Sequence, residues 1–125
     1  MTDACLLDCA VAGVPRRIIG IAPALASEKL LKGQGLKIND IEVADLNEAF
    51  ASQGPAVLRQ LGFPDDAQHV NPNDGTIALG QPRGMSGARF ALAATEELQR
   101  RSARRTFCTM CIGVGQAIAL VVERV

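Results

Sequence analysis

The sequence predicts a single α/β domain built on a mixed, five-stranded sheet with helices on both faces. Short apolar runs typical of buried strands alternate with segments whose apolar residues recur at helical spacing. The chain ends in two strand-like runs, 106–112 and 116–123, which a short glycine-containing turn joins as an antiparallel hairpin at the edge of the sheet. A length of 125 residues fits one domain, residues 1–125.

The first part of the chain is expected to form a strand, a helix and a second strand. Residues 4–12 are a short apolar run, which is typical of a buried strand. Residues 23–32 begin with a proline, which suits the first turn of a helix, and glycines follow their end. Residues 41–46 alternate apolar and polar side chains and therefore predict a strand.

The middle of the chain is expected to form a helix and then a long loop. The helix is predicted over residues 48–62, with Asn47 as its N-cap and Phe50 in its apolar stripe. Residues 71–84 are rich in Gly, Pro, Asn and Asp, so they predict a loop with at most a short strand at its start. That short strand would be the fifth of the sheet.

The helix predicted over residues 86–101 carries small or apolar side chains on nearly every face of its first turns. A helix that is apolar all round is usually buried all round. One sheet in a domain of 125 residues has difficulty covering a helix on both sides. We therefore expect this helix to need a partner from outside the chain.

Composition excludes several classes of function. Thirteen basic and thirteen acidic residues give a net charge of zero, which removes the overall attraction to nucleic acids and anionic membranes. Aromatic residues are 3% of the chain and all are Phe, which argues against a stacking platform for nucleic acid bases. No apolar run approaches the roughly 20 residues that span a bilayer. No signal peptide is apparent, so we expect a cytoplasmic protein.

Four cysteines form two close pairs. Cys5 and Cys9 lie near one end of the chain, and Cys108 and Cys111 near the other. A zinc site or a redox pair is an alternative for this spacing, but both pairs lie in strand-like runs where alternate side chains face opposite ways. We therefore expect no metal, and we expect Cys5, Cys9 and Cys108 to be small buried apolar residues.

Three segments carry a further pattern. Residues 47–51 read N-E-A-F-A, residues 73–89 read N-D-G-T-I-A-L-G-Q-P-R-G-M-S-G-A-R, and residues 111–116 read C-I-G-V-G-Q. In this order they resemble the N-E-A-F, G-H-P-x-G-A-S-G-A-R and C-x-G-x-G motifs of the thiolases. These acyltransferases make or cleave 3-ketoacyl-CoA. The resemblance covers about residues 4–125 and corresponds to the C-terminal half of a thiolase.

The resemblance implies how the domain is used. In thiolases two similar α/β halves pack in layers, and one helix from each half is buried between the sheets. This would explain the apolar helix at 86–101. The nucleophilic cysteine belongs to the N-terminal half, so the resemblance implies that either this half or a second copy of the chain, in a homodimer, covers the helix.

The resemblance also assigns site residues. Asn47 would hold a water that stabilises a thioester oxyanion, and Cys111 would be the second acid/base cysteine. The backbone N–H of Gly113 would join a second oxyanion hole. Gln81 stands where the family has the histidine that activates the nucleophile. The substrate would be a coenzyme A thioester, with no tightly bound cofactor and no metal.

Three departures from the family pattern fall in one loop. Gln81 can donate a hydrogen bond, but it has no titratable nitrogen and cannot accept the proton of the nucleophile. Asp74 stands where the family prefers Gly, and Arg83 where an aliphatic residue is usual. We therefore expect the chain alone to be inactive. The alternative is a non-catalytic interaction module or decayed paralogue that dimerises through helix 86–101.

Overall fold

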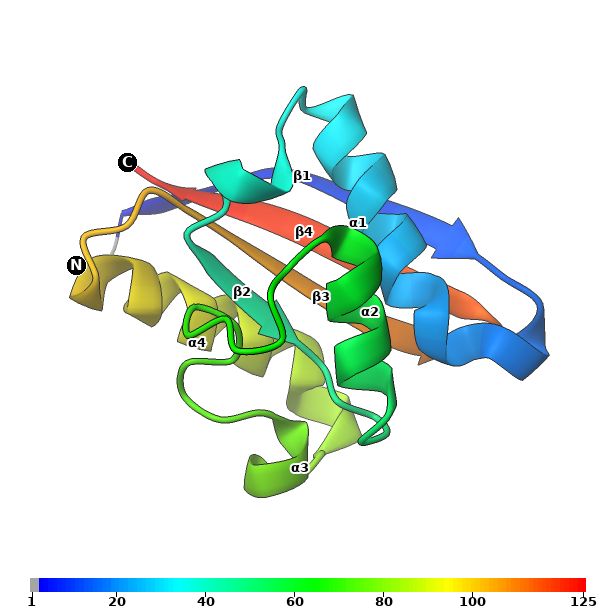
Figure 1. The fold of residues 1–125 in the computed structure, drawn as a ribbon. Coiled ribbons are helices and arrows are strands. Elements are labelled where there is room, and N and C mark those ends of the chain that lie inside the picture. The colour runs from blue at the N-terminus through cyan, green and yellow to red at the C-terminus, as the bar shows by residue number, and fades with distance from the viewer. Residues whose placement is uncertain (1–2) are drawn as a thin grey trace.

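The computed structural model describes residues 3–125, in which one sheet lies between helices on its two faces (Figure 1). The strands lie in the order β1-β4-β3-β2. The pairs β1–β4 and β4–β3 are antiparallel, whereas β3–β2 is parallel, so the prediction of a mixed sheet is confirmed. The strands are β1 (Ala4–Gly13), β2 (Val43–Leu46), β3 (Arg105–Gly113) and β4 (Gln116–Arg124).

The prediction of a fifth strand is wrong: within residues 3–125 the sheet has four strands. The expected strand is reduced to a single parallel bridge between Val70 and Ala44 of β2. The N–H of Asn71 still donates to the carbonyl of Ala44 at 2.8 Å. Asn71 then adopts a positive φ of 46° and Pro72 follows it without an N–H to donate, so the chain leaves the sheet at this point.

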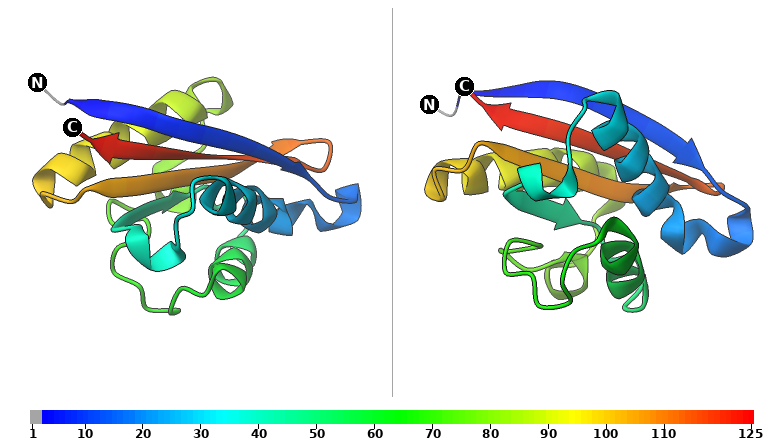
Figure 2. Two further views of the ribbon diagram at one scale, coloured as in Figure 1. Left: turned by 90° about the horizontal axis from the view of Figure 1, so that it is seen from above. Right: turned by 45° about the horizontal axis from the view of Figure 1, so that its top comes forward.

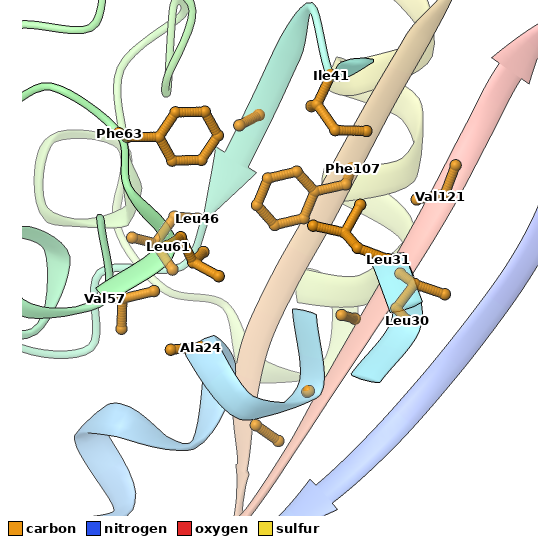
Figure 3. Packing of buried hydrophobic residues seen from close by; sticks show 14 of the residues in the cluster. Ala24, Leu30, Leu31, Ile41, Leu46, Val57, Leu61, Phe63, Phe107 and Val121 are labelled. Atoms are coloured by element: carbon orange, nitrogen blue, oxygen red, sulfur yellow. The ribbon is translucent and has the colours of Figure 1, made fainter. Parts of the chain in front are cut away.

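Two helices cover one face of the sheet, α1 (Ala22–Gly33) and α2 (Gln53–Leu61). The small residues Ala22 and Ala24 are fully buried and let α1 lie close to the strands. Leu30 and Leu31 of α1 pack beside Phe107 of β3 and complete the main apolar core (Figure 3). The helix predicted at 23–32 is thus confirmed with one additional residue at each end.

Helix α2 begins later than predicted, and Asn47 is not its N-cap. Residues 48–52 form turns because the side chains of Asn47 and Glu48 bind the loop that follows α2. Asn47 accepts a hydrogen bond from Thr76, and Glu48 accepts one from Asn71. Phe50 lies in this segment with 58% of its surface exposed, so its predicted place in a buried stripe is also wrong.

Helix α4 (Ser86–Arg100) lies on the opposite face of the sheet, where it packs against β2, β3 and β4 (Figure 2). Phe90 and Ala94 of α4 are buried against Cys108, whose predicted burial is confirmed. The other side of the helix is open, since Leu92 is 64% exposed. Within the described residues the helix is therefore not buried on all sides.

Strand β1 is an edge strand, and its side on the α4 face is open to solvent. Leu6 is 59% and Val11 44% exposed. Cys5 and Cys9 are also exposed, so the prediction that they are buried is wrong. Because β1 pairs only with β4, it lies beyond the three strands that α4 covers.

No helix among residues 3–125 is long and apolar enough to cross a membrane. Short helices connect the longer elements. The helical turn α3 (Thr76–Leu79) belongs to the loop predicted at 71–84. The connecting 3-10 helices are Arg16–Ile21, Ile38–Asp40 and Arg83–Met85.

Candidate active site

The candidate site lies where the two parallel strands end. Strands β2 and β3 run in the same direction, so their carboxyl ends meet at one edge of the sheet (Figure 1). Asn47 follows the last residue of β2, and its N–H donates to the carbonyl of Thr109 in β3 at 3.0 Å. Cys111 and Gly113 form the end of β3. The carboxyl ends of parallel strands are where α/β folds commonly bind ligands.

The side chain of Asn47 is fully buried and only half satisfied. Its Oδ1 accepts a hydrogen bond from Oγ1 of Thr76 at 2.7 Å. Its Nδ2 has no hydrogen-bond partner among the described residues. An unpaired buried amide destabilises a fold by about 1–3 kcal/mol, so such a group calls for a functional reason.

Glu48 attaches the loop that carries Thr76 to the end of β2. Its carboxylate accepts hydrogen bonds from Nδ2 of Asn71 at 3.2 Å and from the N–H of Ile77 at 3.3 Å. The same carboxylate lies where a Cβ on Gly75 would be, so only glycine fits this position without a shift. Glu48 belongs to the N-E-A-F-A segment, and its position beside Asn47 is the only sign of this contact in the sequence.

Asp74 is one of the departures from the thiolase pattern, and its backbone explains why glycine suits the position. Its φ is +66°, in the left-handed region that glycine enters freely and that Asp and Asn enter more readily than most residues. Its N–H donates to the carbonyl of Asn71 at 3.1 Å and closes the turn. The substitution is therefore compatible with the loop.

Gln81 lies beyond α3, after Gly80 at φ +83°, on an exposed stretch of the loop. Within residues 3–125 its amide forms no hydrogen bond, and the structure does not bring it into hydrogen-bond contact with Asn47 or Cys111. Arg83 is exposed close by. The loop therefore presents an amide and a guanidinium to whatever faces this edge.

Cys111 lies at the same edge as Asn47 but on the other face of the sheet. Its half-buried thiol shares the α1 side of the strands with its partner Ala117, whereas Asn47 continues the α4 side of β2. Gly113 has a φ of +98°, which favours glycine. The structure thus gathers three of the proposed residues at one edge without joining them in one hydrogen-bonded group.

The hairpin after Gly113 is held in place by the start of the chain. Val114 and Gly115 both have positive φ, as a two-residue turn between twisted strands requires. The N–H of Val14 donates to the carbonyl of Gly115 at 2.7 Å, and the carbonyl of Val14 lies where a Cβ on Gly115 would be. The end of β3 is therefore anchored.

Sequence analysis missed a buried polar group beneath α4. Burial raises the pKa of Asp45 to about 6, although the nearby Arg89 guanidinium opposes the shift and Glu48 adds to it. Burial also raises the pKa of Cys108, with Asp45 contributing, so this thiol stays protonated. The signal in the sequence was an acidic residue inside the short strand that ends at Leu46, just before Asn47.

Among residues 3–125 no three His, Cys, Asp or Glu side chains are grouped so that they could hold a metal ion. All four cysteines are free. Cys108 and Cys111 lie on opposite faces of β3, since Cys108 packs under α4 and Cys111 pairs with Ala117 on the α1 side. The close spacing in sequence therefore does not make a chelating pair.

Comparison with known proteins identifies what this arrangement is similar to. A family model described as "Thiolase, C-terminal domain" matches residues 1–124. The 3-oxoadipyl-CoA/3-oxo-5,6-dehydrosuberyl-CoA thiolase of Escherichia coli (strain K12) is 60% identical over 116 residues, which cover 93% of this chain and 29% of that protein. The beta-ketoadipyl-CoA thiolase of Pseudomonas putida is 53% identical over 120 residues, which cover 96% of this chain and 30% of that protein.

A solved structure supports the same relationship. The acetyl-CoA acetyltransferase of Bacillus anthracis superimposes with a TM-score of 0.92 at 36% sequence identity, covering 98% of this chain and 30% of that one. The prediction of a thiolase-like α/β fold is confirmed. The chain spans less than a third of the length of each of these three proteins.

Proposed function

We propose, on the premise that the chain belongs to the thiolase family as a C-terminal domain, that it supplies one side of an acyltransferase active site. The proposed reaction is thiolysis of a 3-oxoacyl-CoA, or the reverse Claisen condensation of acyl-CoA thioesters. A second lobe, which the N-terminal part of a thiolase provides, supplies the nucleophilic cysteine. Coenzyme A enters only as the carrier in the substrates.

The observation that carries this proposal is the buried, unpartnered Nδ2 of Asn47 at the carboxyl edge of the parallel strands. An amide in this position holds a water against a thioester oxyanion, where a preorganised donor acts at low dielectric. Cys111 moves a proton at the α-carbon or the leaving group. The N–H of Gly113 donates to the second oxyanion, and the absence of a side chain leaves that backbone open.

The proposed substrate class follows from the relatives. Proteins that are 53–60% identical to this chain are thiolases named for 3-oxoadipyl-CoA or beta-ketoadipyl-CoA. Both names describe the same compound, a 3-oxoacyl thioester whose acyl chain ends in a free carboxylate. 3-Oxoadipyl-CoA is therefore the first substrate to test, with acetoacetyl-CoA as the shorter comparison.

The open side of α4 supports the need for a second lobe. Leu92 is 64% exposed on the helix that thiolases bury between their halves, and Met85, just before this helix, is 49% exposed. Leu6 and Val11 of β1 are also exposed on the α4 side of the sheet. Exposed apolar surface of this kind favours association. We infer that the companion is an N-terminal thiolase lobe, and that a homodimer through the same helix forms when this lobe is absent.

Gln81 limits the proposed activity. It donates a hydrogen bond to an oxyanion, but it cannot take the proton of a nucleophilic thiol. Loss of a general base lowers a rate by about 10²–10⁴-fold. We therefore expect the chain alone to be inactive, and we expect an enzyme assembled around it to be slow.

A chimaera tests the proposal. In the chimaera, this chain replaces the matching segment of the E. coli relative. Thiolysis of 3-oxoadipyl-CoA is measured for the unsubstituted chimaera, for its Gln81→His variant and for a control variant, Gln68→His, which is changed on an exposed loop. We expect Gln81→His to raise kcat by about 10²–10⁴-fold and the control to change nothing. If Cys111→Ala and Asn47→Ala leave the rate of a folded Gln81→His chimaera unchanged, the proposed roles are wrong.

A further inference from the structure

A chain of two side-chain hydrogen bonds ends on Asn47. Nη2 of Arg89 in α4 donates to Oγ1 of Thr76 at 3.2 Å, and that hydroxyl lies 2.7 Å from Oδ1 of Asn47. Thr76 is 4% exposed and Asn47 is fully buried, so water does not replace the bond between them. The three residues come from α4, from α3 and from the end of β2.

Arg89 is itself held in one place. Its guanidinium lies 4.2 Å from the centre of the Phe90 ring, and Phe90 is buried. Its charge also acts on the buried carboxylate of Asp45. The aromatic ring attracts the guanidinium through a cation–π contact, and the carboxylate attracts it through its charge.

The direction of this chain follows from the chemistry of its first member. A guanidinium has only donors, so Oγ1 of Thr76 must accept from Arg89. A hydroxyl has a single proton, which is then free to be donated to Oδ1 of Asn47. The opposite orientation of the Asn47 amide would leave the Thr76 proton without an acceptor in a buried place, which is unfavourable.

We propose that Thr76, held by Arg89, is a positioning residue that fixes the Asn47 amide with its NH₂ group toward the active-site edge. This orientation presents a donor to the developing oxyanion or to the water that contacts it. The opposite orientation would present a carbonyl oxygen, which repels an oxyanion. The inference deepens the proposed function and rests on it for its catalytic consequence, although the amide orientation itself does not depend on activity.

The orientation is tested by NMR on the 125-residue chain labelled with ¹⁵N. In the unsubstituted chain we expect one pair of Asn47 Nδ2 proton resonances, which Asn47→Asp identifies by removing them. Thr76→Val, or the smaller Thr76→Ala if the valine variant does not fold, should double or broaden that pair, because both orientations become populated. Thr76→Ser should restore a single sharp pair. A single, unshifted pair in a folded variant without the hydroxyl overturns the inference.

The catalytic consequence is tested by a double-mutant cycle in the chimaera that carries Gln81→His. We expect Thr76→Val to lower kcat about tenfold with little change in KM, the size of one lost hydrogen bond. Thr76→Ser should recover most of the rate. In the Asn47→Ala background Thr76→Val should have no further effect, since it acts only through that amide.

The outcomes separate the two proposals. An equal loss from Thr76→Val with and without Asn47 shows that Thr76 acts elsewhere and overturns the inference. A folded chimaera without any activity in the Gln81→His form contradicts the proposed function instead, and the NMR result on Thr76 then still decides the orientation of Asn47.

Discussion

The two faces of the sheet differ in how completely the chain covers them. On the α1 face, Leu30 and Val121 are no more than 1% exposed, and the core is closed by α1 and α2. On the α4 face, Leu92 is 64% exposed on the open side of the helix, and Leu6 is 59% exposed because the helix covers only three of the four strands. One face of the sheet is thus covered by the chain itself, and the other is partly exposed. This is the form expected of a domain that packs against a second lobe.

The faces also differ in chemistry. The α1 face is an apolar cluster of aliphatic residues and two Phe rings. The α4 face holds two buried carboxylates and a half-buried guanidinium: Asp45, Glu97, whose carboxylate is bound by Arg100 and Arg101, and Arg89. Burial alone would raise the pKa of Glu97, but hydrogen bonds from Asn73 and the two arginines lower it overall. Of the candidate site residues, Asn47 belongs to this polar, open face, whereas Cys111 lies on the α1 side.

The largest expected effect compares one leucine from each face. Leu30→Ala leaves a cavity in the closed core and should lower the free energy of unfolding of the chain by about 2–5 kcal/mol. Leu92→Ala, also in a helix, removes a side chain that is mostly in solvent and should change it by about 0.5 kcal/mol or less. Urea denaturation of both variants measures the difference. Equal losses would mean that the α4 face is closed in solution.

A smaller effect follows from Asp45, the buried acid of the α4 face. Its pKa is raised from 3.8 to about 6, so the folded chain keeps a proton that the unfolded chain loses over this interval. The free energy of unfolding should therefore fall as the pH rises from about 4 to about 6. At about 1.4 kcal/mol per unit the fall is at most about 3 kcal/mol, and it persists at higher pH.

The matched variant is Asp45→Asn, measured by urea denaturation from pH 4 to pH 8. It should lack this fall and should be more stable than the unsubstituted chain above about pH 6. The lowered pKa values of Glu97 and Glu123 act in the opposite sense, since their contribution is lost as the pH decreases. Both are present in both proteins and cancel in the difference. Parallel pH profiles would contradict the assignment to Asp45.

Local sequence patterns predicted the helices and strands that have strong periodicity. The helix at 86–101 and the strands of the final hairpin are confirmed within one or two residues, because their apolar spacing and turn glycines agree with the tertiary structure. The predicted place of the hairpin at the edge of the sheet is wrong, since β1 pairs with β4 and β2 with β3, so that β3 and β4 are the two central strands. The helix expected from residue 48 starts at Gln53 because Asn47 and Glu48 bind a loop that lies more than twenty residues away. Such long-range bonds leave no periodic signal.

The sequence motifs predicted which segments form the candidate site, but not the contacts between their side chains. The segments containing Asn47 and Cys111 were found from resemblance, and the parallel pairing of β2 with β3 places them at one edge. The contacts of Thr76, Arg89 and Asp45 were not found, because three separate elements bring these side chains together. The exposure of Cys5 was missed for a related reason: an apolar run does not reveal that its strand lies at an edge.

The central claim is that the exposed α4 face binds a second lobe. Its most direct test is amide hydrogen exchange, measured with and without the N-terminal part of the E. coli relative. The account predicts that this part binds and that residues 86–93 of α4, together with β1, become protected at least about tenfold, whereas α1, already buried, changes little. Absence of binding, or protection of α1 in place of α4, would contradict it.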